Sequence, residues 1–524
     1  MTKPDDQSSM APAEPRPWWE TRWFVAAMIL LACVPLAYPP VPPLVDLLGH
    51  MGRYRVQLDL WQSPDLQRFY AFDWHLIGNL GVDLLVDPLS KLFGLELAVK
   101  LIAMAIPPMT VAGFLWVARE VHHRLPPTAA FALPLAFAHP VLFGFLNFAL
   151  SMALAFLAFG LWLRLGRLGR TRLRALLFVP ISFLIFVTHT FGWGTLGLLA
   201  FSAEAVRQHD KGTTWWKAGL RAAMHALVMV GPVFVMLAWR STVQQGGTAD
   251  WFNIAIKADY LLKVFRDRWE WFDIASVLVV AIVLGFAIAN RRLTFSRNLA
   301  FSALVLFAGF LLLPRIIFGS AYADMRLASY ILATALLAIR FRADTFMPMA
   351  RVLAVLGVGF YLLRVIATTA SLAMAADDQT AKLEALDHVP RGARLVSLVG
   401  QDCRRLWALP RNSHLPAMAI VRRHAFSNDQ WAIEGANLLS VHYKPAGRFI
   451  ADPSQIVRPA ACAHREAWAV DRALAAIPRE AFDYLWLIDV PPHDPRNLEG
   501  MRLIWRGPGS LLYAVEKSGG QPNP

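Results

Sequence analysis

Long apolar stretches, separated by short polar segments, run through the chain as far as residue 375. A helix of about 20 apolar residues is long enough to cross a bilayer, and most of these stretches approach that length. The pattern predicts eleven membrane-spanning helices, at residues 23–37, 97–117, 127–143, 145–164, 175–190, 192–206, 218–239, 274–290, 298–317, 325–341 and 351–374.

Two pairs of these predicted spans are nearly fused. Residues 138–140 (Ala-His-Pro) interrupt one apolar stretch and residues 188–192 (Thr-His-Thr-Phe-Gly) interrupt another, so each pair is predicted to form a tight hairpin. Polar backbone at membrane depth is tolerated only inside a protein or along a wet cavity. His139, His189 and Asn147 at these breaks are therefore candidate cavity residues, and a purely structural role remains the alternative for each histidine.

The pattern changes to that of a soluble domain at about residue 376. Gly507-Pro508-Gly509 is a hairpin turn signal between two short apolar runs. The predicted strands are residues 393–397, 484–490, 501–505 and 511–515, and the predicted helices are residues 414–424 and 467–477. This is a small α/β domain. It contains Cys403 and Cys462, which form either a disulfide or two free thiols.

Composition points to the same class of protein. Hydrophobic residues make up 56% of the 524 residues and charged residues only 17%, against roughly 25% charged in a typical soluble domain. The mean hydropathy is +0.43. These values exclude a disordered, collagen-like or coiled-coil chain, and three cysteines exclude a disulfide-rich scaffold or a Cys-rich zinc site.

The chain carries 51 Lys and Arg against 37 Asp and Glu, a formal net charge of +14. Such a surplus is typical of nucleic-acid binding or of cytoplasmic loops in a membrane protein, and the positions of the charges decide between them. With the spans given above, five basic loops fall on one side of the membrane, which the positive-inside rule makes the cytoplasmic side. Their basic residues are Arg119 and Arg124; Arg164, Arg167, Arg170, Arg172 and Arg174; Arg207, Lys211, Lys217 and Arg221; Arg291, Arg292 and Arg297; and Arg340, Arg342 and Arg351.

This sidedness requires that the apolar segment at residues 75–92 does not cross the membrane. The segment contains Asp83, Asp87 and Lys91, and we interpret it as a helix lying at the interface. The predicted fold class is an α-helical polytopic membrane protein with a C-terminal soluble α/β domain. Its parts are a disordered cytoplasmic tail (1–21), a transmembrane domain (22–375) with a long exterior first loop (41–96), and an exterior α/β domain (376–524).

Motifs of soluble enzymes are absent from the sequence. There is no P-loop, no GxGxxG opening a helix after a strand, no CxxC pair and no HExxH, and the C-terminal domain has no nucleophile elbow. An enzyme driven by ATP is therefore disfavoured.

Polar chemistry gathers instead just after the first predicted span. Asp46 and His50 are four residues apart and Arg53 follows three residues later, so one helix face presents all three side chains. A carboxylate beside an imidazole and a guanidinium suits proton abstraction close to a phosphate ester. The alternative is an interfacial helix in which Asp46 and Arg53 simply form a salt bridge.

This layout resembles the GT-C superfamily of integral-membrane glycosyltransferases, which use polyprenyl-phosphate-linked sugars as donors. In that superfamily a long exterior loop with a catalytic Asp near its start follows the first span, and Asp46 matches this carboxylate. Residues 74–94 are similar to a juxtamembrane helix of protein-mannosyltransferase-like members, although His75 is not followed by Pro-Pro and Asp46 lacks the adjacent Glu common there. Residues 144–150 resemble a segment of uncharacterised bacterial multi-pass proteins, which implies a bacterial inner membrane.

The resemblance implies a set of site residues. Asp46 and His50 are the expected catalytic pair. Arg326, Arg315 and Arg53 are expected to bind the lipid phosphate, with Asp324 orienting one guanidinium, and an Asp–Arg pair capping the tenth span is the alternative for Asp324. The expected cavity-lining residues are Asp73, His75, Asp83, His189 and Asp324.

The reaction implied is inverting transfer of a sugar from a polyprenyl-phosphate donor to a glycan, lipid or protein acceptor on the exterior face. No cofactor and no nucleic-acid partner are expected, no protein metal ligands are assigned, and a divalent cation at the donor phosphate is left open. Two alternatives remain at this stage, a transporter or flippase of lipid-linked saccharides and a non-catalytic partner in surface-polysaccharide assembly. The lack of an inverted repeat in the hydropathy pattern disfavours the first of them.

Overall fold

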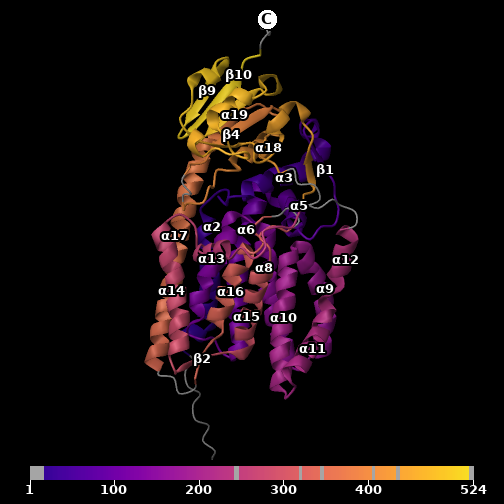
Figure 1. Ribbon diagram of the computed structural model, residues 1–524, viewed down its shortest axis with the longest axis vertical. Coiled ribbons are helices and arrows are strands. Elements are labelled where there is room, and N and C mark those ends of the chain that lie inside the picture. Colours follow the sequence, from indigo (N-terminus) through magenta and orange to yellow (C-terminus); the bar gives the residue numbers. More distant parts are fainter. Residues whose placement is uncertain are drawn as a thin grey trace, which may run out of the picture.

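The computed structural model describes residues 17–240, 247–317, 321–342, 347–403, 407–431 and 437–517. A bundle of helices forms one end of the molecule, and a sheet-containing C-terminal domain forms the other (Figure 1). Residues 1–16 of the expected disordered tail lie outside the described residues. The end of that tail is ordered, because Trp18–Glu20 form a 3₁₀ helix and the Thr21 side chain accepts a hydrogen bond from the Phe24 amide at the start of α1.

Five helices of the bundle are long and apolar enough to cross a membrane. They are α6 (Leu95–His122), α8 (Leu146–Arg167), α9 (Thr171–Thr188), α14 (Glu270–Ala289) and α17 (Met347–Leu383). A sixth span results if α11 (Trp215–Ala226) and α12 (Gly231–Arg240), which are bent by 60° relative to one another, count as one. The other helices of the bundle are α1 (Arg22–Leu31), α2 (Val34–Ala37), α7 (His139–Phe143), α10 (Thr190–Asp210), α15 (Arg297–Leu312) and α16 (Met325–Leu337).

Each of the eleven ranges expected to span the membrane contains helix, but the number of crossings remains a prediction. The range 127–143 differs most from the expectation of a regular span. It consists of a 3₁₀ helix at Ala129–Phe137, every residue of which is buried, followed by the short helix α7. Protein therefore surrounds this segment, which contacts α6, α16 and α17.

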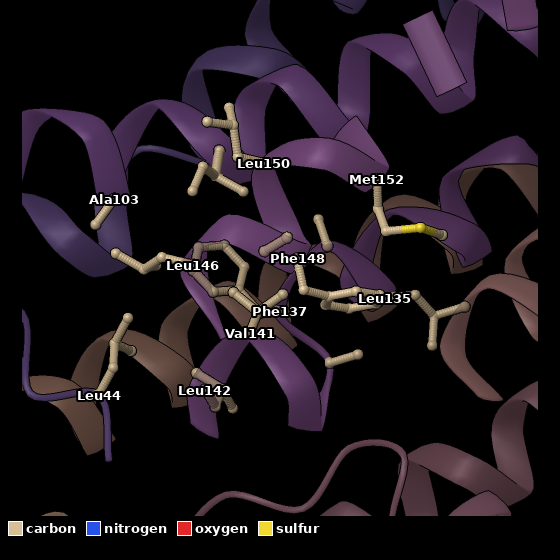
Figure 2. Packing of buried hydrophobic residues seen from close by; sticks show 14 of the residues in the cluster. Leu44, Ala103, Leu135, Phe137, Val141, Leu142, Leu146, Phe148, Leu150 and Met152 are labelled. Carbon is tan, nitrogen blue, oxygen red and sulfur yellow. The ribbon is translucent and has the colours of Figure 1, made fainter. Parts of the chain in front are cut away.

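The turn after α7 is anchored by the apolar core. Figure 2 shows Leu142, Leu146 and Phe148 around this turn, with Leu44 of the first loop close by. All four side chains are buried in one hydrophobic cluster. Burial of these apolar side chains together stabilises the contact between the turn and the start of the first loop.

The first loop contains α3 (Leu47–Asp59), α4 (Pro64–Gln67), β1 (Tyr70–Phe72) and α5 (Gly81–Phe93). At about 1.5 Å per residue, the 13 residues of α5 span far less than the apolar thickness of a bilayer. Leu84, Leu92 and Phe93 are exposed on it. Its length and its exposed apolar side chains agree with a helix lying at the interface. A second loop contains the nine-residue helix α13 (Ile254–Leu262).

The C-terminal domain is built on a mixed six-stranded sheet of order β7-β6-β4-β8-β10-β9, in which β10 is antiparallel to both of its neighbours and the remaining pairs are parallel. The strands are β4 (Leu395–Gly400), β6 (Ile456–Arg458), β7 (Trp468–Ala469), β8 (Tyr484–Ile488), β9 (Met501–Gly507) and β10 (Ser510–Val515), and the helices are α18 (Met418–Arg423) and α19 (Val470–Ala476). The predicted strands, helices and hairpin are thus confirmed, with ends shifted by a few residues. Cys403 and Cys462 form a disulfide.

The first loop and the C-terminal domain pack as one layer over the bundle (Figure 1). β1 pairs in antiparallel fashion with β5 (Leu439–Val441). α3 approaches the domain closely, since a Cβ on Gly49 would lie 2.6 Å from Trp431 and one on Gly52 would lie 2.7 Å from Gln430. α17 runs without a break from the bundle into the domain as far as Leu383.

The five basic loops meet at the opposite end of the bundle. There β2 (Leu293–Phe295) pairs with β3 (Ile339–Phe341), and β2 lies far from the C-terminal domain in Figure 1. Residues from all five loops line one cavity, among them Glu120, Arg167, Arg207, Arg297 and Arg340. The prediction that these loops share one side is confirmed, and the compartment they face remains a prediction.

Candidate active site

A cavity of about 390 Å³ lies where the helical bundle meets the first loop and the C-terminal domain. Side chains from three parts of the chain line it. Asp46, His50, Arg53 and Tyr54 come from the first loop, Phe145, Asn147, His189, Tyr322 and Arg326 from the bundle and its connections, and Trp431, Asn437 and Asp452 from the C-terminal domain. The cavity thus exists only because the chain brings these three parts together.

Asp46 is held by the backbone of the turn that follows α7. Its amide donates to the carbonyl of Phe143 at 2.9 Å, and the Val45 amide donates to the carbonyl of Leu142 at 3.4 Å. Gly144 makes this approach feasible, because its φ is +100° and a Cβ there would lie only 2.9 Å from the Asp46 amide nitrogen. The turn therefore fixes the position of Asp46 immediately before α3.

The helix α3 orders the residues that follow Asp46. The His50 amide donates to the carbonyl of Asp46 at 3.1 Å, and Asp46, His50 and Arg53 all line the cavity. This is the shared helix face that their spacing predicts.

The charge state of Asp46 is set by its surroundings. Burial raises the pKa of the Asp46 carboxyl well above its usual range, the negative charge of Asp452 raises it further, and the positive charge of Arg326 acts in the opposite direction. A carboxylate with a raised pKa is a stronger base once it is ionised.

Arg326 supplies a buried positive charge on the bundle side of the cavity. Its guanidinium carbon lies 4.6 Å from the ring centroid of Phe145, 5.7 Å from that of Phe148 and 5.4 Å from that of Phe191. Cation–π contacts of this kind hold a guanidinium in place.

His189 connects Arg326 to the second hairpin break. Its Nε2 lies 3.4 Å from Nη1 of Arg326, and its Nδ1 accepts a hydrogen bond from the Phe191 amide at the start of α10. The structural and the cavity-lining interpretations of His189 therefore both apply.

Arg53 is held by partners on both sides of the cavity wall. It forms a buried ion pair with Asp83, with Nη2 and Oδ1 2.7 Å apart. Asn147 donates to the other carboxylate oxygen of Asp83 at 3.1 Å, and Nη1 of Arg53 donates to Asn437 at 3.2 Å. Asp83 therefore lies behind the cavity and neutralises Arg53, so Arg53 is a weaker candidate for phosphate binding than its position in the sequence suggests.

Two predicted site residues lie elsewhere because they pair with other partners. Arg315 is hydrogen-bonded through Nε to Asp250 at 2.5 Å and does not line the cavity. Asp324 caps α16 by accepting from the Met325 amide, and its other oxygen lies 2.8 Å from Nζ of Lys257. Asp324 thus caps the helix, as its alternative interpretation held, but it pairs with Lys257 on α13 instead of orienting an arginine.

Asp73 and His75 are also outside the cavity. The side chain of Asp73 is 95% exposed, and Nδ1 of His75 lies 3.1 Å from the Asp73 carbonyl oxygen. They belong to the segment between β1 and α5, where neither side chain is among the cavity-lining residues.

The C-terminal domain contributes residues that the sequence analysis did not select. Trp431 packs against both histidines of the site, at 4.8 Å between ring centroids for His50 and 4.5 Å for His414. Nε2 of His414 lies 4.0 Å from Oδ1 of Asp46. Asp452 lines the cavity and accepts a hydrogen bond from Gln455 at 2.7 Å. These residues follow the first loop by several hundred positions, and no local pattern marks them.

Burial controls the protonation of the histidines as well. It lowers the pKa of His50 well below its usual range, and the positive charge of Arg53 acts in the same direction. Burial also lowers the pKa of His414, against the opposing effect of Asp452. Both imidazoles are therefore neutral at pH 7 and can accept or relay a proton. Within the part of the chain that the structure describes, no group of three or more His, Cys, Asp or Glu side chains is arranged to hold a metal ion.

Comparison with known proteins gives no match to a family model and none to a curated protein. Solved structures that are similar include two of one protein. ArnT from Cupriavidus metallidurans bound to undecaprenyl phosphate is 11% identical, with 96% of this chain and 99% of that chain covered and a TM-score of 0.49. The same protein in the apo state is 12% identical, with coverages of 94% and 97% and a TM-score of 0.49. The likeness extends over nearly the whole of both chains.

Proposed function

We propose that this protein is a membrane glycosyltransferase that moves a sugar from a polyprenyl-phosphate donor to an acceptor hydroxyl. One observation carries the proposal. A carboxyl of raised pKa, Asp46, and a buried guanidinium, Arg326, line the same cavity between the apolar bundle and the C-terminal domain. Transfer from such a donor needs a base for the acceptor and a cation for the departing lipid phosphate, and these two groups supply them.

Arg326 is the residue that binds the donor phosphate. Its guanidinium lines the cavity against the rings of Phe145 and Phe148, whereas Arg53 is held in a buried ion pair with Asp83. A guanidinium offers N–H donors in the planar arrangement that matches phosphate oxygens. Its place on α16, at the bundle side of the cavity, puts the phosphate next to the apolar surface along which a polyprenyl chain would lie.

Asp46 is the general base. In the proposed step the acceptor oxygen attacks the anomeric carbon and its proton passes to Asp46. The bond between the anomeric carbon and the phosphate oxygen breaks, and the polyprenyl phosphate leaves with the bonding electrons, stabilised by Arg326. Attack from the face opposite the leaving group inverts the anomeric centre. The step needs no oxidant, nucleotide or further reactant.

His50 and His414 are positioning residues in this scheme. Both are neutral because of burial, and both pack against Trp431. They border Asp46 on the side of the C-terminal domain, so an acceptor that enters from that side meets the imidazoles and Asp452 before it reaches the base.

The test uses the purified full-length protein in detergent with a panel of polyprenyl-phosphate sugars and a mixture of membrane glycolipids and glycans. Loss of sugar from one donor, with matching release of polyprenyl phosphate and a labelled product, is the expected result. Movement of intact donor across a vesicle membrane without cleavage would contradict the proposal and favour a transporter. The proposal would also be contradicted if the donor were neither cleaved nor moved, provided that another transferase is shown to use the same donor pool.

A further inference from the structure

A second cavity lies at the end of the bundle opposite the C-terminal domain, and the reaction described above does not use it. Its volume is about 720 Å³, within the range of about 300–1,000 Å³ typical of sites that enclose a ligand. The ends of α6, α8, α9 and α10 and the β2–β3 pair surround it. It is thus built from all five basic loops, and only a folded bundle brings them together.

The lining of this cavity has an excess of positive charge. Three acidic residues, Glu120, Glu204 and Asp210, face six arginines. The arginines are Arg167, Arg174, Arg207, Arg297, Arg340 and Arg342.

Four of these arginines form ion pairs with the three acidic residues. Arg167 lies 2.8 Å from Glu120, and Arg297 lies 2.5 Å from Asp210. Arg174 and Arg207 share Glu204, at 3.1 and 2.6 Å.

Arg340 and Arg342 remain without a carboxylate partner among the residues that the structure describes. Both are exposed at the cavity rim. Arg340 is paired with Thr294 in the register of β2 and β3, and the Arg342 amide donates to the Arg292 carbonyl at 3.2 Å. The backbone therefore presents the two guanidinium groups from one side of a paired strand, an arrangement suited to a phosphate group.

Trp162 and Arg174 line the cavity side by side. The guanidinium carbon of Arg174 lies 3.9 Å from the ring centroid of Trp162, and both side chains are buried. The shared carboxylate of Glu204 fixes Arg174 from the other side. A cavity whose lining positions Arg174 against Trp162, and whose rim carries two arginines with no carboxylate partner among the described residues, is suited to an anion.

The cavity also adjoins a surface of the kind found at the edge of a bilayer. Trp215 and Trp216 are exposed at the start of α11, and Trp215 stacks on His209 at 4.1 Å between ring centroids. His209 is next to Asp210, which lines the cavity. Exposed tryptophans beside lysine and arginine mark the level of lipid headgroups, where phospholipid phosphates are the neighbouring anions.

We propose that this basic cavity binds the phosphate-bearing headgroup of an anionic phospholipid from the leaflet at that end of the bundle. Arg340 and Arg342 contact the phosphate oxygens, and the remainder of the headgroup fills the space above Trp162. A bound lipid joins α6, α8, α9 and α10 to the β2–β3 pair, so it stabilises the end of the bundle remote from the proposed active site.

The test measures lipid binding to the full-length protein by native mass spectrometry, with phosphatidylglycerol and phosphatidylcholine added in equal amounts. The wild-type protein should retain one phosphatidylglycerol in preference to phosphatidylcholine. The double variant Arg340→Gln, Arg342→Gln should bind phosphatidylglycerol about tenfold or more weakly, since each arginine near a lipid surface is worth on the order of a factor of five. The matched control, Arg170→Gln with Arg172→Gln, removes two charges from the same face outside the cavity and should bind as the wild type does.

A second measurement does not depend on the folding of a variant. Photoactivatable phosphatidylglycerol, added to the wild-type protein, should crosslink to peptides that contain residues 294–297 and 339–342. Crosslinks spread evenly over the five basic loops, equal losses in both double variants, or no preference over phosphatidylcholine would overturn the proposal. Binding of inorganic phosphate or glycerol phosphate as tightly as phosphatidylglycerol would overturn the assignment of the anion to a lipid.

Discussion

Nε2 of His414 lies 4.0 Å from Oδ1 of Asp46, and Nδ1 of the same ring lies 3.9 Å from Oδ2 of Asp429. One imidazole therefore stands between a carboxyl of the first loop and a buried carboxyl of the C-terminal domain. The Asp429 backbone carbonyl, 3.2 Å from Nδ1, fixes the ring further. The C-terminal domain is thus part of the electrostatic environment of Asp46.

The pH dependence of sugar transfer should report the pKa of Asp46. Asp46 accepts a proton only when it is ionised, so activity should fall as the pH drops through a pKa that burial and Asp452 hold well above the usual aspartate range. The variant Asp452→Asn removes the neighbouring negative charge and should move the acidic limb of the kcat/KM profile to lower pH. An acidic limb that stays in place, or moves to higher pH, would show that Asp452 does not act on the base.

Arg326 should matter far more to catalysis than Arg315. Arg326→Gln removes the cation that faces the departing phosphate and should lower kcat/KM by about 100-fold or more, as loss of one preorganised electrostatic contact does in other enzymes. Arg315→Gln is the matched control, because Arg315 pairs with Asp250 outside the cavity. Equal losses in steady-state assays of the two variants would contradict the assignment of the phosphate to Arg326.

Gly144 should be needed for the site and not only for the local backbone. Gly144→Ala puts a Cβ 2.9 Å from the Asp46 amide nitrogen at a φ of +100°, so both strain and a clash push Asp46 away from its place. Gly212→Ala provides the control, since its φ is +87° and nothing lies within 4 Å of its added Cβ. Both variants should lose about 1–3 kcal/mol of stability from backbone strain, seen as a lower thermal midpoint, but Gly144→Ala alone should lose transfer activity.

Asp429 should make the fold less stable as the pH rises. Burial raises the pKa of Asp429 to about 7, and Asp452 adds to this effect against the hydrogen bond from Ser427. The folded state therefore favours the protonated carboxyl. The free energy of unfolding falls by no more than about 1.4 kcal/mol per pH unit as the pH rises from the unfolded-state pKa, near 4, to about 7. The thermal midpoint of Asp429→Asn should rise relative to that of the wild type over this pH range, and the difference between them should stay constant at higher pH. A difference that is constant from pH 4 to pH 8 would contradict a raised pKa.

Much of the architecture could be predicted because hydrophobic length and charge placement are local signals. An even number of predicted spans separates each basic loop from the next, so the sequence predicts that these loops share one side. The spacing of Asp46, His50 and Arg53 places them on one face because α3 is a regular helix there. Strands and turns of the C-terminal domain follow from alternating apolar residues and glycines.

Pairing between distant segments could not be predicted in the same way. Asp324 and Arg326 are two residues apart, but one carboxylate oxygen of Asp324 caps α16 and the other pairs with Lys257 on another helix. Arg315 is drawn to Asp250 for the same reason, an ion pair with a residue 65 positions away. His414 and Asp452 join Asp46 only because β1 and α3 dock on the C-terminal domain, an association of surfaces that leaves no periodic pattern.

The measurement that tests the central proposal most directly is sugar transfer by Asp46→Asn beside Asp73→Asn. The two variants make the same chemical change, one at the cavity and one at an exposed side chain in the same loop. Thermal unfolding first shows that both variants are folded. With a polyprenyl-phosphate sugar donor, Asp73→Asn should then transfer at the wild-type rate and Asp46→Asn should form no measurable product. Wild-type transfer by Asp46→Asn would contradict the account.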